Sequence, residues 1–312
     1  MQPLVTIGLP VLNSEKTLKA AICSILNQTY CNWELIIIDD GSKDRTLSVA
    51  QSFQDPRITV IADGLHMNLS HRLNQAISLA KGKYFARMDG DDISYPERLE
   101  AQVRYMEKHP NIDLLATRTI VFDKDGHSRG CTFATESHAE ICSRPWSGFP
   151  LAHPTWLGKL EWFLTHQYRE NAIRMEDYDL LLRTYKTSCF SCLPQILLGY
   201  RVESLSLKKI LASRYHHCIT LMNKAFFEKD YLLAVGVVEQ AIKALVDIFA
   251  IATGLNFKLL RHRAGSPVNQ VDLIKWEATW DTCNSDNINQ QHPGQLLNSP
   301  KCFLSTNSDG IK

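Results

Sequence analysis

The sequence of 312 residues lacks an apolar run long enough to cross a bilayer. The nearest candidate covers residues 232–254, but Glu239, Lys243 and Asp247 interrupt it. These three residues follow one another at intervals of four, so they share one face of a helix. The segment is therefore predicted to be an amphipathic helix and not a membrane span.

Charge of one sign is also scarce. The formal net charge is +1 at pH 7, so nothing global indicates a nucleic-acid partner. The nine cysteines are scattered and odd in number, and they cannot all pair with one another. No basic segment followed by an apolar one precedes the first strand-like residues at Leu4. Together these features predict a cytoplasmic protein in a reducing compartment.

What the sequence does contain is a regular alternation of strand and helix patterns over residues 4–122. Ser14 is predicted to cap the first helix. The predicted strands are short, apolar or β-branched runs at residues 5–9, 35–38, 58–61, 84–88 and 112–122. This order predicts an α/β fold, in which a mostly parallel central sheet carries helices on both faces.

The rest of the chain divides into segments of different character. Residues 123–204 are irregular and rich in aromatics, and we expect them to complete a catalytic domain with residues 1–122. Residues 205–263 predict a C-terminal helical extension. Residues 264–312 are rich in Asn, Gln, Ser and Pro with little periodicity, which predicts a poorly ordered tail.

Two readings of residues 205–263 stay open. The favoured one is a helical hairpin that packs on the catalytic domain or on a second copy in a homodimer. The other is peripheral contact with a membrane surface that carries a lipid-linked acceptor, because Lys258, Arg261 and Arg263 follow the amphipathic helix. In that reading the protein works at the inner face of the membrane.

Acidic residues occur at the ends of two predicted strands. Asp39 and Asp40 follow one strand directly, and Asp89, Asp91 and Asp92 follow another. Ligands of parallel α/β sheets bind outside the carboxyl ends of the strands. Carboxylates one residue apart suit Mg²⁺ or Mn²⁺, which prefer oxygen ligands.

A second acidic segment contains Glu176, Asp177 and Asp179, and Leu180 and the two leucines after it follow directly. This order indicates carboxylates in the first turn of a helix, where the helix dipole favours negative charge. The segment taken alone is better explained by helix capping.

All these pieces together resemble the family 2 glycosyltransferases, which have a GT-A fold. The resemblance covers roughly residues 4–204 and rests on segments that occur in the family's order. They are VTIGLPVLNSE at 5–15, SILNQTY at 24–30, WELIIIDDGS at 33–42, LNQAI at 73–77, AKGKYFARMDGDD at 80–92, HPT at 153–155 and MEDYDL at 175–180. Gly8 departs from the pattern, because a larger apolar residue is more usual inside the first strand.

The resemblance implies an inverting enzyme that moves a sugar from a nucleotide-diphosphate donor, a UDP- or GDP-sugar, to an acceptor hydroxyl. The implied cofactor is Mn²⁺ or Mg²⁺. The implied acceptor is a carbohydrate or glycolipid, as in polysaccharide or glycolipid assembly. The Gln-x-x-Arg-Trp motif and the membrane spans of the processive members are absent from the sequence, which implies transfer of a single sugar.

On the donor side, the resemblance implies that Pro10, Asn13 and Glu15 line the nucleotide pocket. Asp39 would accept a hydrogen bond from the base, with Asp40 close by. A carboxylate suits this role because uracil and guanine present an N–H group.

At the reacting centre, Asp89 would contact the ribose or the metal, and Asp91 would hold the metal. Asp177 is the candidate general base for the acceptor hydroxyl. Glu176 would assist it or cap the helix, and His153 is placed near the metal or the acceptor, although a structural histidine is the favoured reading. Arg72 and Arg87 could add positive charge near the phosphates, but surface or ion-pair roles are equally compatible, so neither is assigned.

Two alternatives remain. A nucleotidyltransferase also joins an α/β sheet to a metal site, but it should carry a glycine- and basic-rich loop after its first strand, and residues 10–15 contain neither glycine nor arginine. A non-catalytic sugar-nucleotide-binding or scaffold protein would bind donor yet tolerate loss of Asp177. The presence of Asp39, Asp89, Asp91 and Asp177 in one chain favours the transferase.

Overall fold

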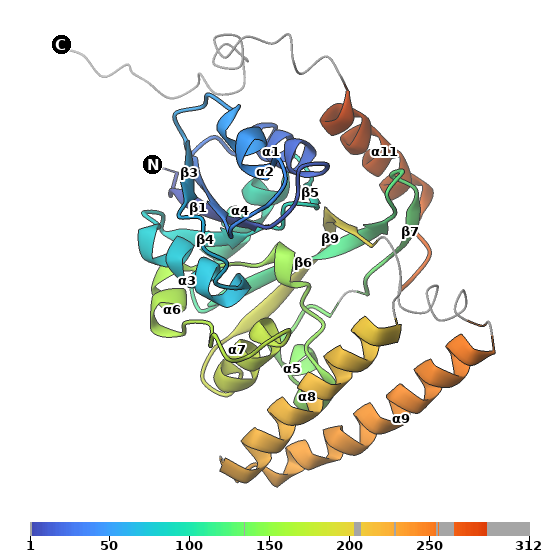
Figure 1. Cartoon of the computed structure of the whole chain (residues 1–312). Coiled ribbons are helices and arrows are strands. Elements are labelled where there is room, and N and C mark those ends of the chain that lie inside the picture. The colour runs from blue at the N-terminus through green and yellow to red at the C-terminus, as the bar shows by residue number, and fades with distance from the viewer. Residues whose placement is uncertain are drawn as a thin grey trace, which may run out of the picture.

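The computed structural model is a single curled sheet with helices on both faces, and a helical hairpin projects from one side (Figure 1). The described residues are 2–133, 135–202, 207–227, 229–253, 255 and 265–285. Within them, nine strands form the sheet in the order β3-β2-β1-β4-β8-β6-β9-β5, and β7 pairs with β6. The strands are β1 (Val5–Val11), β2 (Trp33–Asp39), β3 (Ile58–Ala62), β4 (Tyr84–Arg87), β5 (Ile93–Ser94), β6 (Leu114–Phe122), β7 (Ser128–Cys131), β8 (Leu157–Lys159) and β9 (Phe190–Arg201).

The sheet is mostly parallel, as the sequence predicts. β1 lies between β2 and β4 and is parallel to both. β3 extends this parallel set beside β2, and β6 and β9 are also parallel to each other. Antiparallel pairing is confined to the short strands β5, β7 and β8. The carboxyl ends of β1, β2 and β4 therefore meet at one edge of the sheet.

Helices cover both faces because the central strands are apolar on both sides. On one face, α1, α2 and α4 share a core cluster with alternate residues of β1. On the other face, α3, α6 and α7 share a second cluster with Ile36 and Ile38 of β2. The helices of this domain are α1 (Leu18–Leu26), α2 (Thr46–Gln51), α3 (Leu69–Leu79), α4 (Arg98–Lys108), α5 (His138–Ile141), α6 (Leu160–Thr165) and α7 (Glu176–Thr184), with short 3₁₀ turns η1 (Pro145–Ser147) and η2 (His153–Thr155).

The capping prediction at Ser14 is wrong. The N-cap of α1 is Thr17, and the Ser14 hydroxyl donates to the carbonyl of Leu12 instead of capping the helix. The Ser14 carbonyl accepts the amides of Thr17 and Leu18, so the chain makes one extra turn before the helix starts.

The prediction of a poorly ordered tail over 264–312 is wrong for part of that range. Residues Gln270–Asn284 form helix α11, which Asn269 caps by accepting the amide of Asp272. Trp276 of α11 is fully buried against Phe122, and its indole N–H donates to the carbonyl of Gly126. Leu273, Trp276, Trp280 and Cys283 pack on the core at helical spacing, a pattern that the polar composition of the segment concealed in the sequence. The part of the predicted tail after residue 285 lies outside the described residues.

The predicted helical extension contains α8 (Leu207–Phe227), the turn η3 (Tyr231–Leu233) and α9 (Ala234–Ala252). These helices lie side by side as a hairpin below the sheet in Figure 1. Leu221, Ala225 and Leu233 of the hairpin pack against Met175 and Tyr178 at the start of α7. No helix among the described residues is both long and apolar enough to span a membrane.

Candidate active site

Three loops meet where β1, β2 and β4 end. The amide of Asp40 donates to the carbonyl of Val11 at 2.8 Å, which ties the β2 loop to the β1 loop. The hydroxyl of Thr17 donates to the carbonyl of Gly90 at 2.8 Å and ties α1 to the β4 loop. A side chain at Gly90 would place its Cβ 2.9 Å from Val11 Cγ1, so only glycine allows this close approach.

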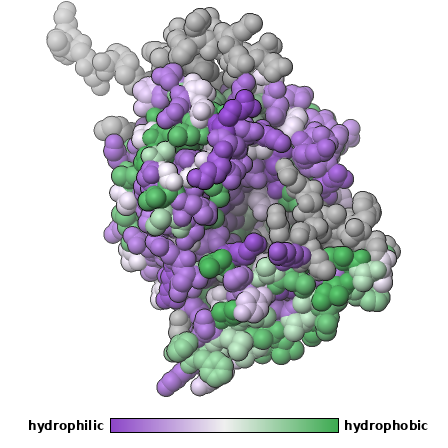
Figure 2. Space-filling model, in the orientation of Figure 1, coloured by the Kyte–Doolittle hydropathy of each residue, from purple (hydrophilic) through white to green (hydrophobic). Residues whose placement is uncertain are grey.

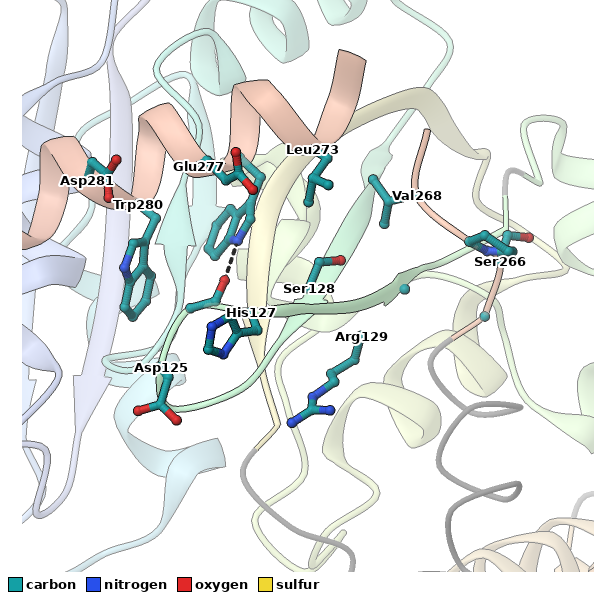
Figure 3. A pocket seen from close by; sticks show the side chains of 15 residues that line it. Asp125, His127, Ser128, Arg129, Ser266, Val268, Leu273, Glu277, Trp280 and Asp281 are labelled. Atoms are coloured by element: carbon teal, nitrogen blue, oxygen red, sulfur yellow. Dashed lines mark hydrogen bonds between the residues drawn. The ribbon is translucent and has the colours of Figure 1, made fainter. Parts of the chain in front are cut away.

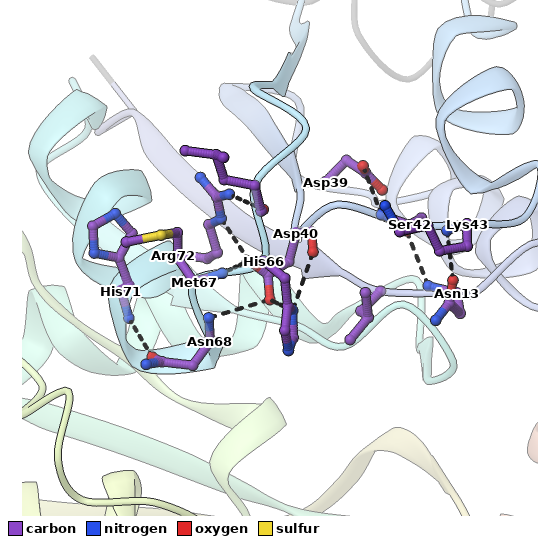
Figure 4. Close-up of polar contacts among 12 residues, drawn as sticks. Asn13, Asp39, Asp40, Ser42, Lys43, His66, Met67, Asn68, His71 and Arg72 are labelled. Atoms are coloured by element: carbon purple, nitrogen blue, oxygen red, sulfur yellow. Dashed lines mark hydrogen bonds and ion pairs between the residues drawn. The ribbon is translucent and has the colours of Figure 1, made fainter.

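The two aspartates after β2 have different surroundings (Figure 4). Both are buried. Oδ2 of Asp39 accepts the amide of Ser42 at 3.1 Å, whereas Oδ1 has no hydrogen-bond partner among the described residues. A buried carboxylate oxygen without a donor is costly unless a ligand supplies one. Asp39 is therefore suited to accept an N–H group from a bound base.

Asp40 is instead occupied by the protein. Its Oδ1 accepts the amide of Met67 and the Nε of Arg72, both at 2.8 Å, and Oδ2 lies 2.8 Å from His66 Nδ1. Burial acts to raise the pKa of Asp40, but these hydrogen bonds outweigh it and lower the pKa. Arg72 is itself buried and also pairs with Asp63 at 2.7 Å. Asp40 and Arg72 thus fix the loop before α3.

The other donor-side residues shape the same loops. Pro10 is buried within β1. The Oδ1 of Asn13 accepts the amide of Lys43 at 2.8 Å, and Asn13 has a positive φ of 51°. Glu15 accepts the amide of Arg45 at 3.1 Å. These contacts hold the β1 and β2 loops together around Asp39.

The acidic loop after β4 fits a divalent cation. Carboxylate oxygens of Asp89, Asp91 and Asp92 all lie within 4.8 Å of one another. Asp92 is buried, and its Oδ2 has no hydrogen-bond partner among the described residues. Burial and the charge of Asp89 raise the pKa of Asp91 to about 6. Crowded carboxylates with a free buried oxygen suit a hard cation with oxygen ligands.

Arginine side chains balance this loop. Buried Arg87 at the end of β4 pairs with Asp89 at 2.7 Å. Arg201 at the end of β9 donates its Nε to the carbonyl of Asp91, and its amide donates to Asp92 Oδ1, both at 2.9 Å. The sequence analysis did not assign Asp92 or Arg201 to the site. Asp92 adjoins the Asp-Gly-Asp motif, but no local pattern marks Arg201, which the fold brings from 110 residues away.

The second acidic segment opens α7, as predicted from the sequence. Burial and the charge of Asp177 raise the pKa of Glu176 to about 7. Burial also raises the pKa of Asp177, while a hydrogen bond from the Tyr178 amide and the charge of Arg87 oppose the rise. Asp89 raises the pKa of both carboxyls, so the fold brings the two acidic segments into electrostatic contact.

His153 lies in the interior between these segments. Its Nε2 is 2.9 Å from the hydroxyl of Tyr168, and its ring packs edge-on against Trp156. Burial and the charge of Arg87 lower the pKa of His153 well below its usual value. A neutral histidine with aromatic neighbours agrees with the structural reading favoured from the sequence.

A separate cavity of ≈ 770 Å³ lies between the β6–β7 hairpin and α11, away from the acidic loops (Figure 3). Its lining includes Asp125, Arg129, Trp276 and Trp280. Arg201 lies 5.7 Å from the ring centre of Trp280, so α11 supports the arginine that holds the acidic loop. This cavity thus borders the back of the site and not its acidic centre.

A curled, mostly parallel sheet with acidic loops at its strand ends is the architecture of a GT-A nucleotide-sugar transferase. The match to the model of glycosyl transferase family 2 covers residues 6–172. The chain therefore belongs to glycosyltransferase family 2, which removes the nucleotidyltransferase alternative.

Relatives identified by sequence are also glycosyltransferases. EpsE of Bacillus subtilis, provisionally named as a glycosyltransferase, is 37% identical over 59% of this chain and 67% of its own length. WfgD of Escherichia coli, named a UDP-Glc:α-D-GlcNAc-diphosphoundecaprenol β-1,3-glucosyltransferase, is 39% identical over 38% of this chain and 49% of its own length.

Solved structures share the fold. TarS residues 1–349 of S. aureus in complex with UDP-GlcNAc has a TM-score of 0.58 and 16% identity, and the match covers 88% of this chain and 79% of that one. The mannosyltransferase PcManGT of Pyrobaculum calidifontis, in complex with GDP-Man and Mn²⁺, has a TM-score of 0.57 and 15% identity, and the match covers 93% and 89%. The GT-A fold is thereby confirmed.

Proposed function

We propose that the protein is an inverting, non-processive glycosyltransferase that moves one sugar from a UDP- or GDP-sugar to a hydroxyl of a carbohydrate or glycolipid acceptor. The observation that carries the proposal is the pairing of two acidic segments with different properties. Carboxylate oxygens of Asp89, Asp91 and Asp92 lie within 4.8 Å of one another, while Glu176 and Asp177 of α7 lie close enough for the charge of Asp89 to raise their pKa values.

On the donor side, the free oxygen of buried Asp39 would accept the N–H of the base. Asp40, Asn13 and Glu15 would act by holding the surrounding loops. The GT-A neighbours bind UDP, UDP-GlcNAc and GDP-Man, which supports a nucleotide-diphosphate sugar as donor.

Asp89, Asp91 and Asp92 would hold Mn²⁺ or Mg²⁺, because their oxygens converge and one buried oxygen is free. When bound, the cation would neutralise the charge that develops on the leaving diphosphate. Mn²⁺ accompanies GDP-Man in the PcManGT structure, which supports this assignment.

Asp177 would take the proton of the acceptor hydroxyl as the hydroxyl oxygen attacks the anomeric carbon. The new carbon–oxygen bond forms as the bond to the diphosphate breaks, so one displacement inverts the configuration. Burial raises the pKa of Asp177, which makes its carboxylate a stronger base than an exposed one. Glu176 would share this environment and contact the acceptor.

The direct test incubates the full chain with UDP- and GDP-sugars and a panel of carbohydrate and glycolipid acceptors in Mn²⁺, Mg²⁺ or EDTA, and measures nucleotide diphosphate release. We expect turnover of one donor class only with a metal. NMR of the transferred sugar should show the opposite anomeric configuration to the donor. A retained configuration would contradict the single displacement, and binding without turnover under every condition would favour the scaffold alternative.

A further inference from the structure

Helix α9 exposes its apolar side chains and turns its polar side chains toward the protein, the reverse of a usual surface helix. A surface helix normally turns its apolar side to the core and its charges to water. In α9, every exposed position holds alanine or a larger apolar residue. The larger exposed side chains are Val235, Val238, Ile242, Leu245, Val246, Ile248 and Phe249.

The polar residues of α9 face the protein instead. Asp247 and Gln240 are buried, and both accept from Arg214 of α8, at 2.6 Å and 2.8 Å. Glu239 accepts from the hydroxyl of Ser147 at 2.6 Å and pairs with Arg144 at 3.0 Å. Inward polar contacts therefore fix the rotation of α9, and its apolar side remains outside.

This apolar surface is broad. At 3.6 residues per turn, the exposed positions of α9 span an arc of roughly 160°. The surface continues onto α8 and the turn between the helices, as Figure 2 shows along the lower edge of the molecule. Its aromatic members there include Phe226 and Phe227, which are 72% and 85% exposed, and Tyr231, which is 69% exposed.

The sequence at the start of α8 and after α9 is basic, whereas Asp230 lies in the turn at the other end of the hairpin. Arg214 contacts α9 near its end and Leu221 contacts it near its start, so the helices are antiparallel. The start of α8, with exposed Lys208, therefore lies beside the end of α9. Lys258, Arg261 and Arg263 follow α9 in the sequence, and residues 204–227 and 248–271 contain no acidic residue.

These features distinguish between the two candidate partners of the hairpin, a second copy of the chain and a membrane surface. A helix–helix contact with a second copy normally has a narrow apolar seam with charged flanks and a polar rim. The outer arc of α9 has no charged position. A broad apolar face with exposed aromatics and neighbouring basic residues is typical of a helix at a membrane surface.

We propose that the α8–α9 hairpin docks on an anionic lipid bilayer, with α9 lying in the plane of its surface. The inner side of the hairpin packs on Met175 and Tyr178, beside the carboxylates that open α7. Docking would thus hold the acceptor side of the site at the membrane. Together with the proposed function, on which this last step rests, it indicates a saccharide on a lipid anchor as the acceptor.

The test measures cosedimentation of the full chain with vesicles of phosphatidylglycerol and phosphatidylethanolamine, and with phosphatidylcholine vesicles as the neutral comparison. The hairpin variant combines Val238→Glu with Leu245→Glu, at positions 62% and 68% exposed. The matched control combines Val271→Glu with Ile274→Glu on α11, at positions 65% and 58% exposed. Circular dichroism and Tm verify that both variants fold.

We expect binding to the anionic vesicles that weakens with salt and falls about tenfold or more in the hairpin variant, but not in the control. No binding by the wild type, or equal loss in both variants, overturns the proposal. A lipid-free dimer that the hairpin variant dissociates, without vesicle binding, assigns the surface to a second copy instead. Vesicle binding without sugar transfer keeps the docking and removes the proposed function.

Discussion

The acidic loop after β4 and the acidic start of α7 are both rich in carboxylates, yet their surroundings differ. In the loop, Asp89, Asp91 and Asp92 converge within 4.8 Å of one another while Arg87 and Arg201 hold them in place. At α7, burial is again the first cause of a raised pKa, but Glu176 and Asp177 form no ion pair among the described residues. Three convergent oxygens held by arginines suit a cation, whereas a buried carboxylate without an ion pair suits a proton.

The number of carboxylates in a segment does not by itself decide between metal binding and proton transfer. The same residue type serves as a candidate metal ligand where three groups crowd, and as a candidate base where a buried carboxylate has no ion-pair partner among the described residues. It also shows why Arg87 matters, because its charge lowers the pKa of Asp177 and Glu176 and pairs with Asp89. Four substitutions test the different roles proposed for the β4 loop and for the start of α7.

The largest effect is expected from Asp91→Asn. Loss of one charge from the crowded loop should weaken metal binding and reduce turnover by about 10⁴-fold, which corresponds to several kcal/mol. The measurement is kcat/KM at saturating Mn²⁺, together with the metal-induced change in Tm. Turnover within a few fold of wild type would remove Asp91 from the proposed metal site.

Asp177→Asn should reduce kcat by about 10³-fold, within the usual range for a general base. The amide keeps the size of the side chain but cannot take a proton. Donor affinity should stay unchanged, because the proposed role of Asp177 is on the acceptor and not on the nucleotide. Steady-state kinetics and donor titration separate the two quantities, and a parallel loss of donor affinity would contradict the assigned role.

Arg201→Met should weaken metal affinity by about tenfold, the lower end for a group that orients ligands. Methionine preserves much of the packing on Phe122 and Trp280 but cannot donate to the carbonyl of Asp91. Turnover at saturating metal should recover. Arg104→Met, which replaces an exposed arginine of α4, is the control and should leave metal affinity unchanged.

Glu176→Gln should have the smallest effect, on the pH dependence of stability. The folded pKa of Glu176 rises from 4.5 to about 7, so the folded protein binds the proton more tightly than the unfolded chain. Its contribution to stability is therefore present at low pH and is lost as pH rises from about 4.5 to about 7. The glutamine variant should gain about 1 kcal/mol, or about 2 °C in Tm, at pH 8 relative to wild type. Thermal unfolding of both proteins at pH 5 and pH 8 measures this gain. An equal Tm difference between the glutamine variant and wild type at the two pH values would contradict the prediction.

Much of the fold could be predicted from the sequence because β1, β2 and β4 are short apolar runs, and β2 and β4 lead directly to acidic residues. Their parallel order places Asp39 and Asp89 at one edge of the sheet. The helix that starts at Glu176 was also predictable, because three leucines follow its acidic first turn.

Features that depend on contacts between distant segments could not be predicted in the same way. Asp40 and Asp39 are neighbours in sequence, but only the fold shows that Arg72 and the Met67 amide occupy Asp40. Arg201 reaches the acidic loop from the last strand without a local motif. Trp276 of α11 is buried against Phe122 of β6, but the polar composition of the surrounding segment predicted a tail there.

Calorimetric donor titration of wild type, Asp91→Asn and Asp177→Asn, with Mn²⁺ and with EDTA, tests the central claim most directly. Wild type and Asp177→Asn should bind one nucleotide sugar with Mn²⁺, and EDTA or Asp91→Asn should remove this binding. Equal donor binding by all three proteins in EDTA would contradict the assignment of the β4 loop to a metal, and loss of donor binding in Asp177→Asn would contradict the assignment of α7 to the acceptor proton.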